Sequence, residues 1–143
     1  MAKTSNTPGR TQAINFFDLE GKLVLVDLPG YGYARVPQRI TSEWKSLIEA
    51  YLLHRTTLQS AVILLDARRG WMDKDLELKD WLEFQQRQYI VVATKVDKLN
   101  QKEEHRNLAA IRREMQDEPI AFSARSGRGV RELWQAIWKT RTK

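Results

Sequence analysis

The sequence predicts an α/β fold with a mostly parallel sheet and helices on both faces. Short apolar runs that end on Asp27, Asp66 and Asp97 are typical of buried strands followed by a turn. These runs alternate with amphipathic stretches of helical length, and such alternation favours a parallel sheet covered by helices. The chain has 143 residues, 42% of them hydrophobic and 29% charged, which suits a single soluble globular domain with a real core.

The first thirteen residues are polar and contain Pro8-Gly9, so they predict an irregular loop. Thr11 follows Gly9-Arg10 and faintly resembles the end of a phosphate-binding G-x-x-x-x-G-K-[ST] loop. The match fails because Thr4 stands in the place of the first glycine and Arg10 in the place of the lysine. We therefore predict no phosphate-binding loop in this stretch.

The next stretch predicts a hairpin, with strands over residues 14–19 and 23–26 joined by a turn at Glu20-Gly21. A glycine-containing loop follows, and then the apolar spacing of an amphipathic helix over residues 40–53. The remaining chain alternates regularly. It predicts strands at residues 60–66, 88–97 and 119–124, and helices at residues 72–86, 102–115 and 129–140.

Composition excludes several classes of site. No cysteine is present, so disulfides and thiolate metal sites are excluded. The only histidines, His54 and His105, lie far apart in the sequence, which argues against a zinc site or a histidine-based catalytic triad. No apolar run approaches the roughly 18 residues of a membrane span, and the N-terminus has no apolar secretory region. These features favour a cytoplasmic protein.

The net charge is +6, and residues 102–143 hold ten Lys and Arg against six Asp and Glu. This excess suits a polyanionic partner such as RNA. A solvated helical surface would carry the same charge, and composition does not choose between the two.

Asp27 ends a predicted strand and is followed by a turn through Pro29 and Gly30. In α/β sheets ligands bind at such strand ends. A carboxylate there can hold Mg²⁺ through water, and the backbone N–H of a glycine can approach a terminal phosphate. The alternative is an ordinary tight turn between a strand and a loop.

Thr94, Lys95, Val96 and Asp97 directly follow the apolar run YIVVA, at the end of another predicted strand. The carboxylate of Asp97 can accept two hydrogen bonds from a purine with an N–H beside an exocyclic NH₂, as guanine has and adenine lacks. The aliphatic stem of Lys95 can cover the base plane while its ammonium stays in water. Lysine and aspartate at a strand end are also common as plain surface residues.

Phe122, Ser123 and Ala124 end the last predicted strand, and Ser123 lies 26 residues after Asp97. The backbone N–H of Ala124 could donate to a guanine carbonyl, with Ser123 shaping the turn. Ser-Ala is a common pair, so this short motif counts only through its order after the others.

The strings PGRTQAINFF, VDLPGYGYA, TKVDK and FSARSGRG occur in this order and resemble the YihA/EngB family of bacterial GTPases, within the translation-factor class. The resemblance covers residues 4–138. It implies a three-layer P-loop-GTPase-like fold, GTP or GDP with Mg²⁺ as cofactors, and a role in assembly of the large ribosomal subunit and its RNA, with effects on cell division and septation. The implied nucleotide-binding residues are Gly9, Arg10, Thr11, Gln12, Asp27, Leu28, Pro29, Gly30, Thr94, Lys95, Val96, Asp97, Phe122, Ser123 and Ala124, of which Thr11 and Asp27 would serve Mg²⁺.

The chain departs from this family in two places. The family begins with a strand, a phosphate-binding loop and a helix that this chain lacks, so we expect an N-terminally truncated single domain over residues 1–143 with compromised phosphate binding. The missing strand should lie between the strands that end at Asp27 and Asp66. Tyr31 stands where many GTPases carry a glutamine that orients the attacking water, so hydrolysis is expected to be slow and no catalytic residue is assigned.

Three functions remain open at this stage. The first is a GTP-binding enzyme, and the second is a degenerate, non-hydrolysing module that binds ribosomal RNA or protein. The third is an unrelated basic RNA-binding domain, against which the retained DLPG and TKVD strings argue. The missing phosphate-binding loop keeps the second function open, and the sequence makes no prediction of oligomeric state.

Overall fold

The computed structural model describes residues 15–28 and 38–141. The chain divides into two compact units, Met1–Thr56 and Thr57–Lys143, and each is described by itself. Hydrogen bonding gives two sheets among the described strands: a two-stranded sheet in the first unit and a three-stranded sheet in the second. Whether residues 1–143 act as one domain stays a prediction.

The first unit contains the predicted hairpin, formed by β1 (Asn15–Leu19) and β2 (Leu23–Asp27) in antiparallel pairing. Glu20 and Gly21 both adopt positive φ, 55° and 72°, as the residues of a type I′ turn do. The turn is closed by a hydrogen bond from the Lys22 N–H to the Leu19 carbonyl at 3.0 Å. The sequence therefore placed the turn correctly, and β2 extends one residue further than expected, to Asp27 itself.

Helix α1 spans Gln38–His54, slightly longer at both ends than the predicted 40–53. From residue 45 onward its side chains are described, and Ile48 and Leu52, one turn apart, are its buried residues. Leu47, which the apolar spacing also placed on the buried side, is 41% exposed.

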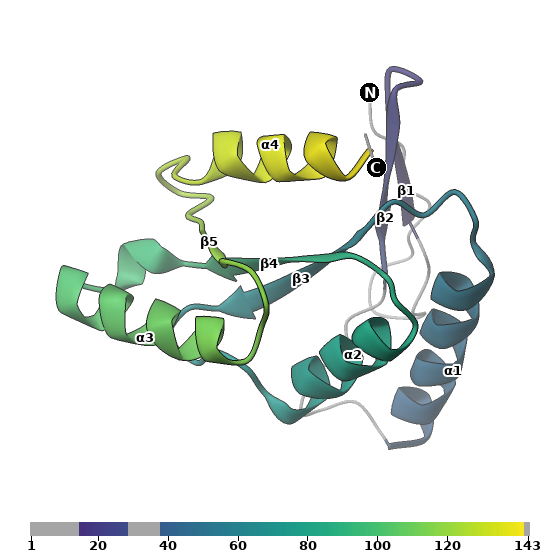
Figure 1. Ribbon diagram of the computed structural model, residues 1–143, viewed down its shortest axis with the longest axis horizontal. Coiled ribbons are helices and arrows are strands. Elements are labelled where there is room, and N and C mark those ends of the chain that lie inside the picture. The colour runs from purple at the N-terminus through teal and green to yellow at the C-terminus, as the bar shows by residue number, and fades with distance from the viewer. Residues whose placement is uncertain (1–14, 29–37, 142–143) are drawn as a thin grey trace. The chain divides into compact units, whose positions relative to one another are not determined.

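The second unit is a parallel α/β structure with β4 as its central strand. Strands β3 (Ala61–Asp66), β4 (Tyr89–Thr94) and β5 (Ile120–Ala121) pair in the order β3-β4-β5, all parallel. Residues 90–93 of β4 are all buried, as expected of a strand covered on both faces. Figure 1 shows helix α4 (Val130–Arg141) on one face of this sheet, with α2 (Asp73–Phe84) and α3 (Gln101–Arg113) on the other. The predicted three-layer, mostly parallel arrangement is confirmed.

Three boundaries in this unit differ from expectation for clear physical reasons. The predicted strand at residues 88–97 ends at Thr94, because Lys95 adopts a left-handed backbone conformation and Val96–Lys98 form a short helical turn. The predicted strand at residues 119–124 shortens to β5 because the chain folds back on itself after Phe122, and the backbone of Ser123 bonds to Arg128 instead of a neighbouring strand. Helix α3 begins at residue 101 because Asn100 caps it: its side chain accepts from the Glu103 N–H at 2.8 Å, and the Glu103 carboxylate accepts from the Asn100 N–H at 3.0 Å.

In the part of the chain that the structure describes, no helix is both long and apolar enough to cross a membrane.

Candidate functional site

Two predicted motifs lie side by side in the second unit. Because β4 and β5 are parallel neighbours, their carboxyl ends meet at one edge of the sheet. The short helix η1 (Val96–Lys98) follows β4, and a loop over residues 122–129 follows β5. The Phe122 N–H donates to the Ala93 carbonyl at 2.9 Å, and the Val96 N–H donates to the Phe122 carbonyl at 3.2 Å. The two segments are thus joined through their backbones.

Ser123 connects the segments through its side chain as well. Its hydroxyl donates to Oδ1 of Asp97 at 2.9 Å and accepts from the Ser126 N–H at 3.1 Å. Its own N–H donates to the Arg128 carbonyl, and its carbonyl accepts from the Gly127 N–H, both at 2.9 Å. Ser123 is 0% exposed, so every polar group of this residue is occupied inside the protein. Its role in this structure is to hold Asp97 and to shape the loop.

One acceptor and one donor at this edge are left without a partner within the described residues. Asp97 is exposed, and its second carboxylate oxygen has no hydrogen bond there. The backbone N–H of Ala124, also exposed, likewise has none. A carboxylate oxygen and an N–H at neighbouring strand ends match the N–H, NH₂ and carbonyl groups of guanine.

Lys95 adopts a left-handed backbone conformation, with φ 62° and ψ 33°. A non-glycine residue at such φ is uncommon, and residues of this kind concentrate at binding sites. The side chain is 58% exposed, and its Nζ lies 3.9 Å from Oδ2 of Asp66. Its aliphatic stem is available to cover a flat ring bound at Asp97.

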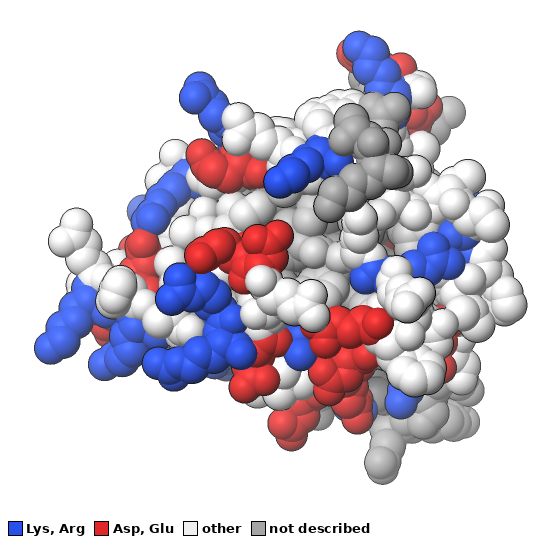
Figure 2. All heavy atoms as spheres, in the orientation of Figure 1, with Lys and Arg blue, Asp and Glu red and all other residues white. Residues whose placement is uncertain are grey.

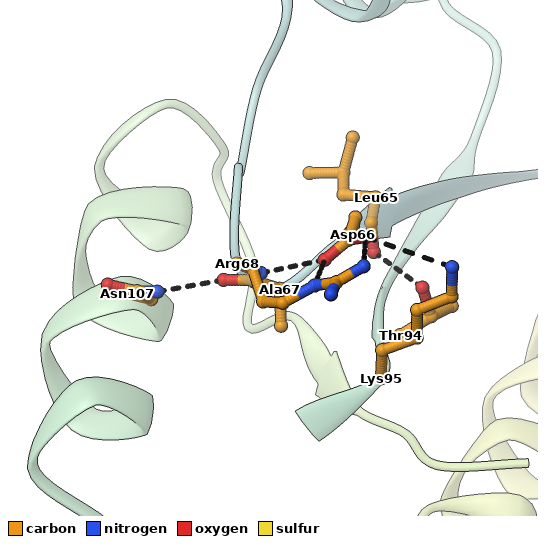
Figure 3. Close-up of polar contacts among 7 residues, drawn as sticks. All are labelled: Leu65, Asp66, Ala67, Arg68, Thr94, Lys95 and Asn107. Atoms are coloured by element: carbon orange, nitrogen blue, oxygen red, sulfur yellow. Dashed lines mark hydrogen bonds and ion pairs between the residues drawn. The ribbon is translucent and has the colours of Figure 1, made fainter. Parts of the chain in front are cut away.

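Asp66, at the end of β3, organises this corner of the sheet (Figure 3). It accepts hydrogen bonds from three groups of Arg68: the backbone N–H at 2.9 Å, Nε at 3.0 Å and Nη2 at 2.7 Å. The hydrogen bond from the Arg68 side chain is the main reason that the pKa of Asp66 falls to about 2. Asp66 is therefore ionised at neutral pH and faces the ammonium of Lys95.

The other groups in this corner are structural (Figure 3). The Thr94 hydroxyl donates to the Leu65 carbonyl at 3.1 Å, and the Ala67 N–H donates to the Thr94 carbonyl at 2.9 Å. The side-chain amide of Asn107, on α3, donates to the Ala67 carbonyl at 2.9 Å. Thr94 thus links β4 to β3 through its hydroxyl.

Arg128 and Glu104 form a two-pronged ion pair that sequence reasoning missed. Nη1 and Nη2 of Arg128 lie 2.6 and 2.7 Å from the two carboxylate oxygens of Glu104. The guanidinium lowers the pKa of Glu104 below its ordinary value. The pair ties the loop over residues 122–129 to α3, and such paired hydrogen bonds fix orientation as well as position. The two residues are 24 apart in sequence, so no local spacing pointed to them.

Asp66 and Arg68 were also missed as site residues, although Asp66 carried a usable signal. It is an acid at the carboxyl end of a buried strand, which was the reason for selecting Asp27 and Asp97. An arginine two residues after such an acid predicts an ion pair across the turn.

The other predicted site residues belong to the first unit or lie outside the described residues. Asp27 ends β2 with its side chain exposed, and Leu28 is half-buried. Asp27 has no hydrogen bond or ion pair within the described residues, so its oxygens are available to a hydrated Mg²⁺. No group of three or more His, Cys, Asp or Glu side chains suited to a metal is found in the described ranges. The predictions for Gly9, Arg10, Thr11, Gln12, Pro29, Gly30 and Tyr31 lie outside the described residues.

Comparison with known proteins gives consistent results. Residues 1–95 match the family model described as "50S ribosome-binding GTPase". The chain is 62% identical over 140 residues to the "Probable GTP-binding protein EngB" of Solibacter usitatus (strain Ellin6076), covering 98% of this chain and 73% of that protein. It is 43% identical over 143 residues to the protein of the same description from Syntrophus aciditrophicus (strain SB), covering 99% and 73%.

Solved structures show the same fold. A crystal structure of a probable GTP-binding protein engB superposes with a TM-score of 0.77 at 23% identity, over 96% of this chain and 84% of that chain. The translation elongation factor SelB from Methanococcus maripaludis, in complex with the GTP analogue GppNHp, superposes with a TM-score of 0.66 at 24% identity, over 92% and 28%.

Proposed function

The chain belongs to the EngB family of GTP-binding proteins, and we propose that it recognises guanine through the edge formed by Asp97, Ser123 and Ala124. The observation that carries this proposal is the hydrogen bond from Ser123 to one carboxylate oxygen of the exposed Asp97, whose other oxygen has no partner within the described residues. This oxygen and its neighbour accept from the N–H and NH₂ of guanine, the Ala124 N–H donates to the guanine carbonyl, and the stem of Lys95 covers the ring.

Discrimination against adenine follows from these groups. Adenine has an unprotonated ring nitrogen at the position where guanine has an N–H. In the proposed site this nitrogen, a hydrogen-bond acceptor, would lie next to the carboxylate of Asp97, which is also an acceptor. A group left without its hydrogen-bond partner costs roughly 1–3 kcal/mol. Sites built around such polar groups therefore reject the mismatched analogue strongly.

We further propose that Mg²⁺ accompanies the nucleotide and is served by Thr11 and Asp27. The fit rests on Asp27, whose exposed carboxylate has no partner within the described residues and is the kind of oxygen donor that Mg²⁺ takes through water. When bound, the ion would neutralise charge on the phosphates. The residues of this chain supply the carboxylate and hydroxyl oxygens that hold it.

The proposed enzymatic activity is slow GTP hydrolysis. Tyr31 occupies the position at which many GTPases carry a water-orienting glutamine, and a phenol does not orient water in the same manner. A partner or a bound ion would then complete the orientation of the water.

The proposed partner is the large ribosomal subunit with its RNA, and the proposed role is assembly of that subunit in the cytoplasm, with consequences for cell division and septation. Support comes from the description of the matching family as ribosome-binding GTPases and from the net charge of +6. Ribosomal RNA is a polyanion, and a basic protein is attracted to it at long range.

Titration of the 143-residue chain with fluorescent GDP, with and without Mg²⁺, tests the nucleotide proposal. We expect binding that unlabelled GDP displaces and ADP does not, and that strengthens with Mg²⁺. Displacement by ADP at the same concentration as GDP would refute guanine recognition at Asp97. Sedimentation of the chain with purified 50S subunits tests the ribosomal proposal separately.

A further inference from the structure

Helix α3 carries three cations on one outer face. At 3.6 residues per turn, Lys102, Arg106 and Arg113 fall within an arc of about 40°, spread over about 16 Å of helix. All three are exposed. We call this set the α3 cationic face. His105 and Arg112 flank it, and the residues between the cations are Ala109 and Ala110.

These three cations lack partners within the described residues, whereas the described lysines of α1 and α2 are paired. Lys102, Arg106 and Arg113 make no ion pair or hydrogen bond through their side chains within the described residues. Elsewhere Lys45 pairs with Glu49 on α1, and Lys74 pairs with Glu77 on α2.

The two helices on the same face of the sheet also differ in charge. Helix α2 has five acids and two lysines, whereas α3 has four Lys or Arg and two Glu. In Figure 2 the Lys and Arg side chains gather over α3, and the Asp and Glu side chains gather over α2. The positive charge is therefore segregated rather than spread evenly over this face.

The inner side of α3 is fixed by contacts to the segment that follows β3. Asn107 donates to the Ala67 carbonyl, the indole N–H of Trp71 donates to the Ile111 carbonyl at 2.9 Å, and the Ile111 side chain is 1% exposed. The cations are thus carried by an anchored helix, and binding a partner there requires no ordering of the backbone.

We propose that the α3 cationic face docks on the phosphate backbone of large-subunit ribosomal RNA, an inference that rests on the ribosomal role proposed above. Contacts to phosphate need cations and little else. A protein partner would call for aromatic or apolar anchors at the centre of the face, and a membrane surface for large apolar side chains beside the cations. The α3 cationic face has neither, since only alanines lie between its charges.

The test measures binding of the full 143-residue chain to purified 50S subunits over a range of salt concentrations. The variant is the triple substitution Lys102→Ala, Arg106→Ala and Arg113→Ala. The matched control removes the same charge from three exposed lysines elsewhere, as Lys22→Ala, Lys45→Ala and Lys74→Ala. A third protein keeps the charge of the α3 cationic face, as Lys102→Arg, Arg106→Lys and Arg113→Lys.

We expect the triple variant to bind at least tenfold more weakly at physiological salt. The slope of log K against log salt should fall by about 2 to 3, because each lost phosphate contact removes roughly 0.7 to 0.9. The control should stay within about twofold of the wild type, because non-specific charge contributes to attraction without making contacts. The charge-keeping variant should bind like the wild type.

Equal weakening of the triple variant and its control would overturn the inference, since net charge alone would then explain binding. Unchanged binding of the triple variant would overturn it while leaving the ribosomal role intact. If the wild type itself fails to bind 50S subunits, the ribosomal role and the inference fall together. If circular dichroism shows that the triple variant is unfolded, the single variants Lys102→Gln and Arg113→Gln replace it. Each single variant is expected to weaken binding two- to fourfold, and unchanged binding of both would overturn the inference.

Discussion

The hydroxyl of Ser123 donates its single proton to Oδ1 of Asp97 across 2.9 Å, although the two residues lie 26 positions apart in the sequence. Ser123 is fully buried and Asp97 is exposed, so the bond runs from the interior to the surface. This bond occupies Oδ1 of Asp97 within the protein, so that the other carboxylate oxygen is the one available to a ligand. The guanine recognition that we propose thus depends on a residue that need not touch the base with its side chain.

Replacing Ser123 with Ala should weaken GDP binding by roughly tenfold, because Asp97 loses the bond that orients it. The Ser126 N–H also loses its acceptor, so the free energy of unfolding should fall by about 1–2 kcal/mol. Fluorescent GDP titration and urea denaturation measure the two effects. Ser126→Ala is the control: its exposed hydroxyl accepts only from the Arg128 N–H at 3.3 Å, so both quantities should change little.

Replacing Asp97 with Asn should reverse base preference and leave the fold intact. The amide presents a donor where the carboxylate presented an acceptor, so the NH₂ of guanine loses its partner, whereas a base with a carbonyl at that carbon gains one. We expect GDP affinity to fall at least a hundredfold and xanthosine diphosphate to bind more tightly than GDP. Competition titrations give both values, and loss of affinity for both nucleotides together would speak against the proposed contact.

Gly129 and Gly127 form a matched pair for testing the loop that follows β5. Both have positive φ, 88° and 83°, so alanine at either position carries a backbone penalty of about 1–2 kcal/mol. A Cβ at Gly129 would also overlap the carbonyl oxygen of Ala121, whereas one at Gly127 would meet nothing within 4 Å. Urea denaturation should therefore show Gly129→Ala to be clearly less stable than Gly127→Ala. Equal losses would mean that the contact with β5 relaxes without cost.

The ion pair between Asp66 and Arg68 predicts a defined pH dependence of stability. The pKa of Asp66 falls from its ordinary 3.8 to about 2, chiefly through the Arg68 side chain. A carboxyl group with a lowered pKa stabilises the fold above its ordinary pKa, and this stabilisation is lost as pH falls from about 4 to about 2. Its size is at most about 2 kcal/mol, and less here because the Arg68 side chain is 46% exposed to solvent.

Arg68→Gln should therefore lower the free energy of unfolding at pH 7, and its difference from the wild type should shrink as pH falls from about 4 to about 2. Urea denaturation at pH 7 and pH 2.5 gives the comparison. The neighbouring Arg69, exposed and without a side-chain partner in the described residues, provides Arg69→Gln as the control. A difference that stays constant with pH would show that Arg68 stabilises the fold without acting on Asp66.

The sequence was sufficient for the parts that depend on local pattern. The alternation of apolar runs and helical spacing predicted β3, β4 and their helices to within a few residues, because a strand buried on both faces, such as β4, is apolar throughout. The turn of the hairpin followed from Glu20-Gly21. β5 was predicted too long, because the signal that ends it is the distant backbone partner of Ser123, which sequence does not reveal.

The placement of the candidate site residues at strand ends was predictable from the sequence, but the contacts between them were not. The TKVD and FSA strings lie at the ends of the neighbouring strands β4 and β5, as predicted. The hydrogen bond between Ser123 and Asp97 and the ion pair between Glu104 and Arg128 are contacts between residues far apart in the sequence. No periodicity in the chain encodes such pairs. The residues that hold a site in place are harder to predict than those expected to contact the ligand, because their partners are chosen by the fold.

The most direct test of guanine recognition at Asp97 is a titration of the ¹⁵N-labelled 143-residue chain with GDP, followed through its amide resonances. We predict that GDP shifts the resonances of Lys95, Asp97 and Ala124, that ADP at the same concentration leaves them in place, and that Asp97→Asn abolishes the response to GDP. Equal shifts with ADP, or shifts with GDP that avoid these three residues, would contradict the assignment of this edge as the guanine site.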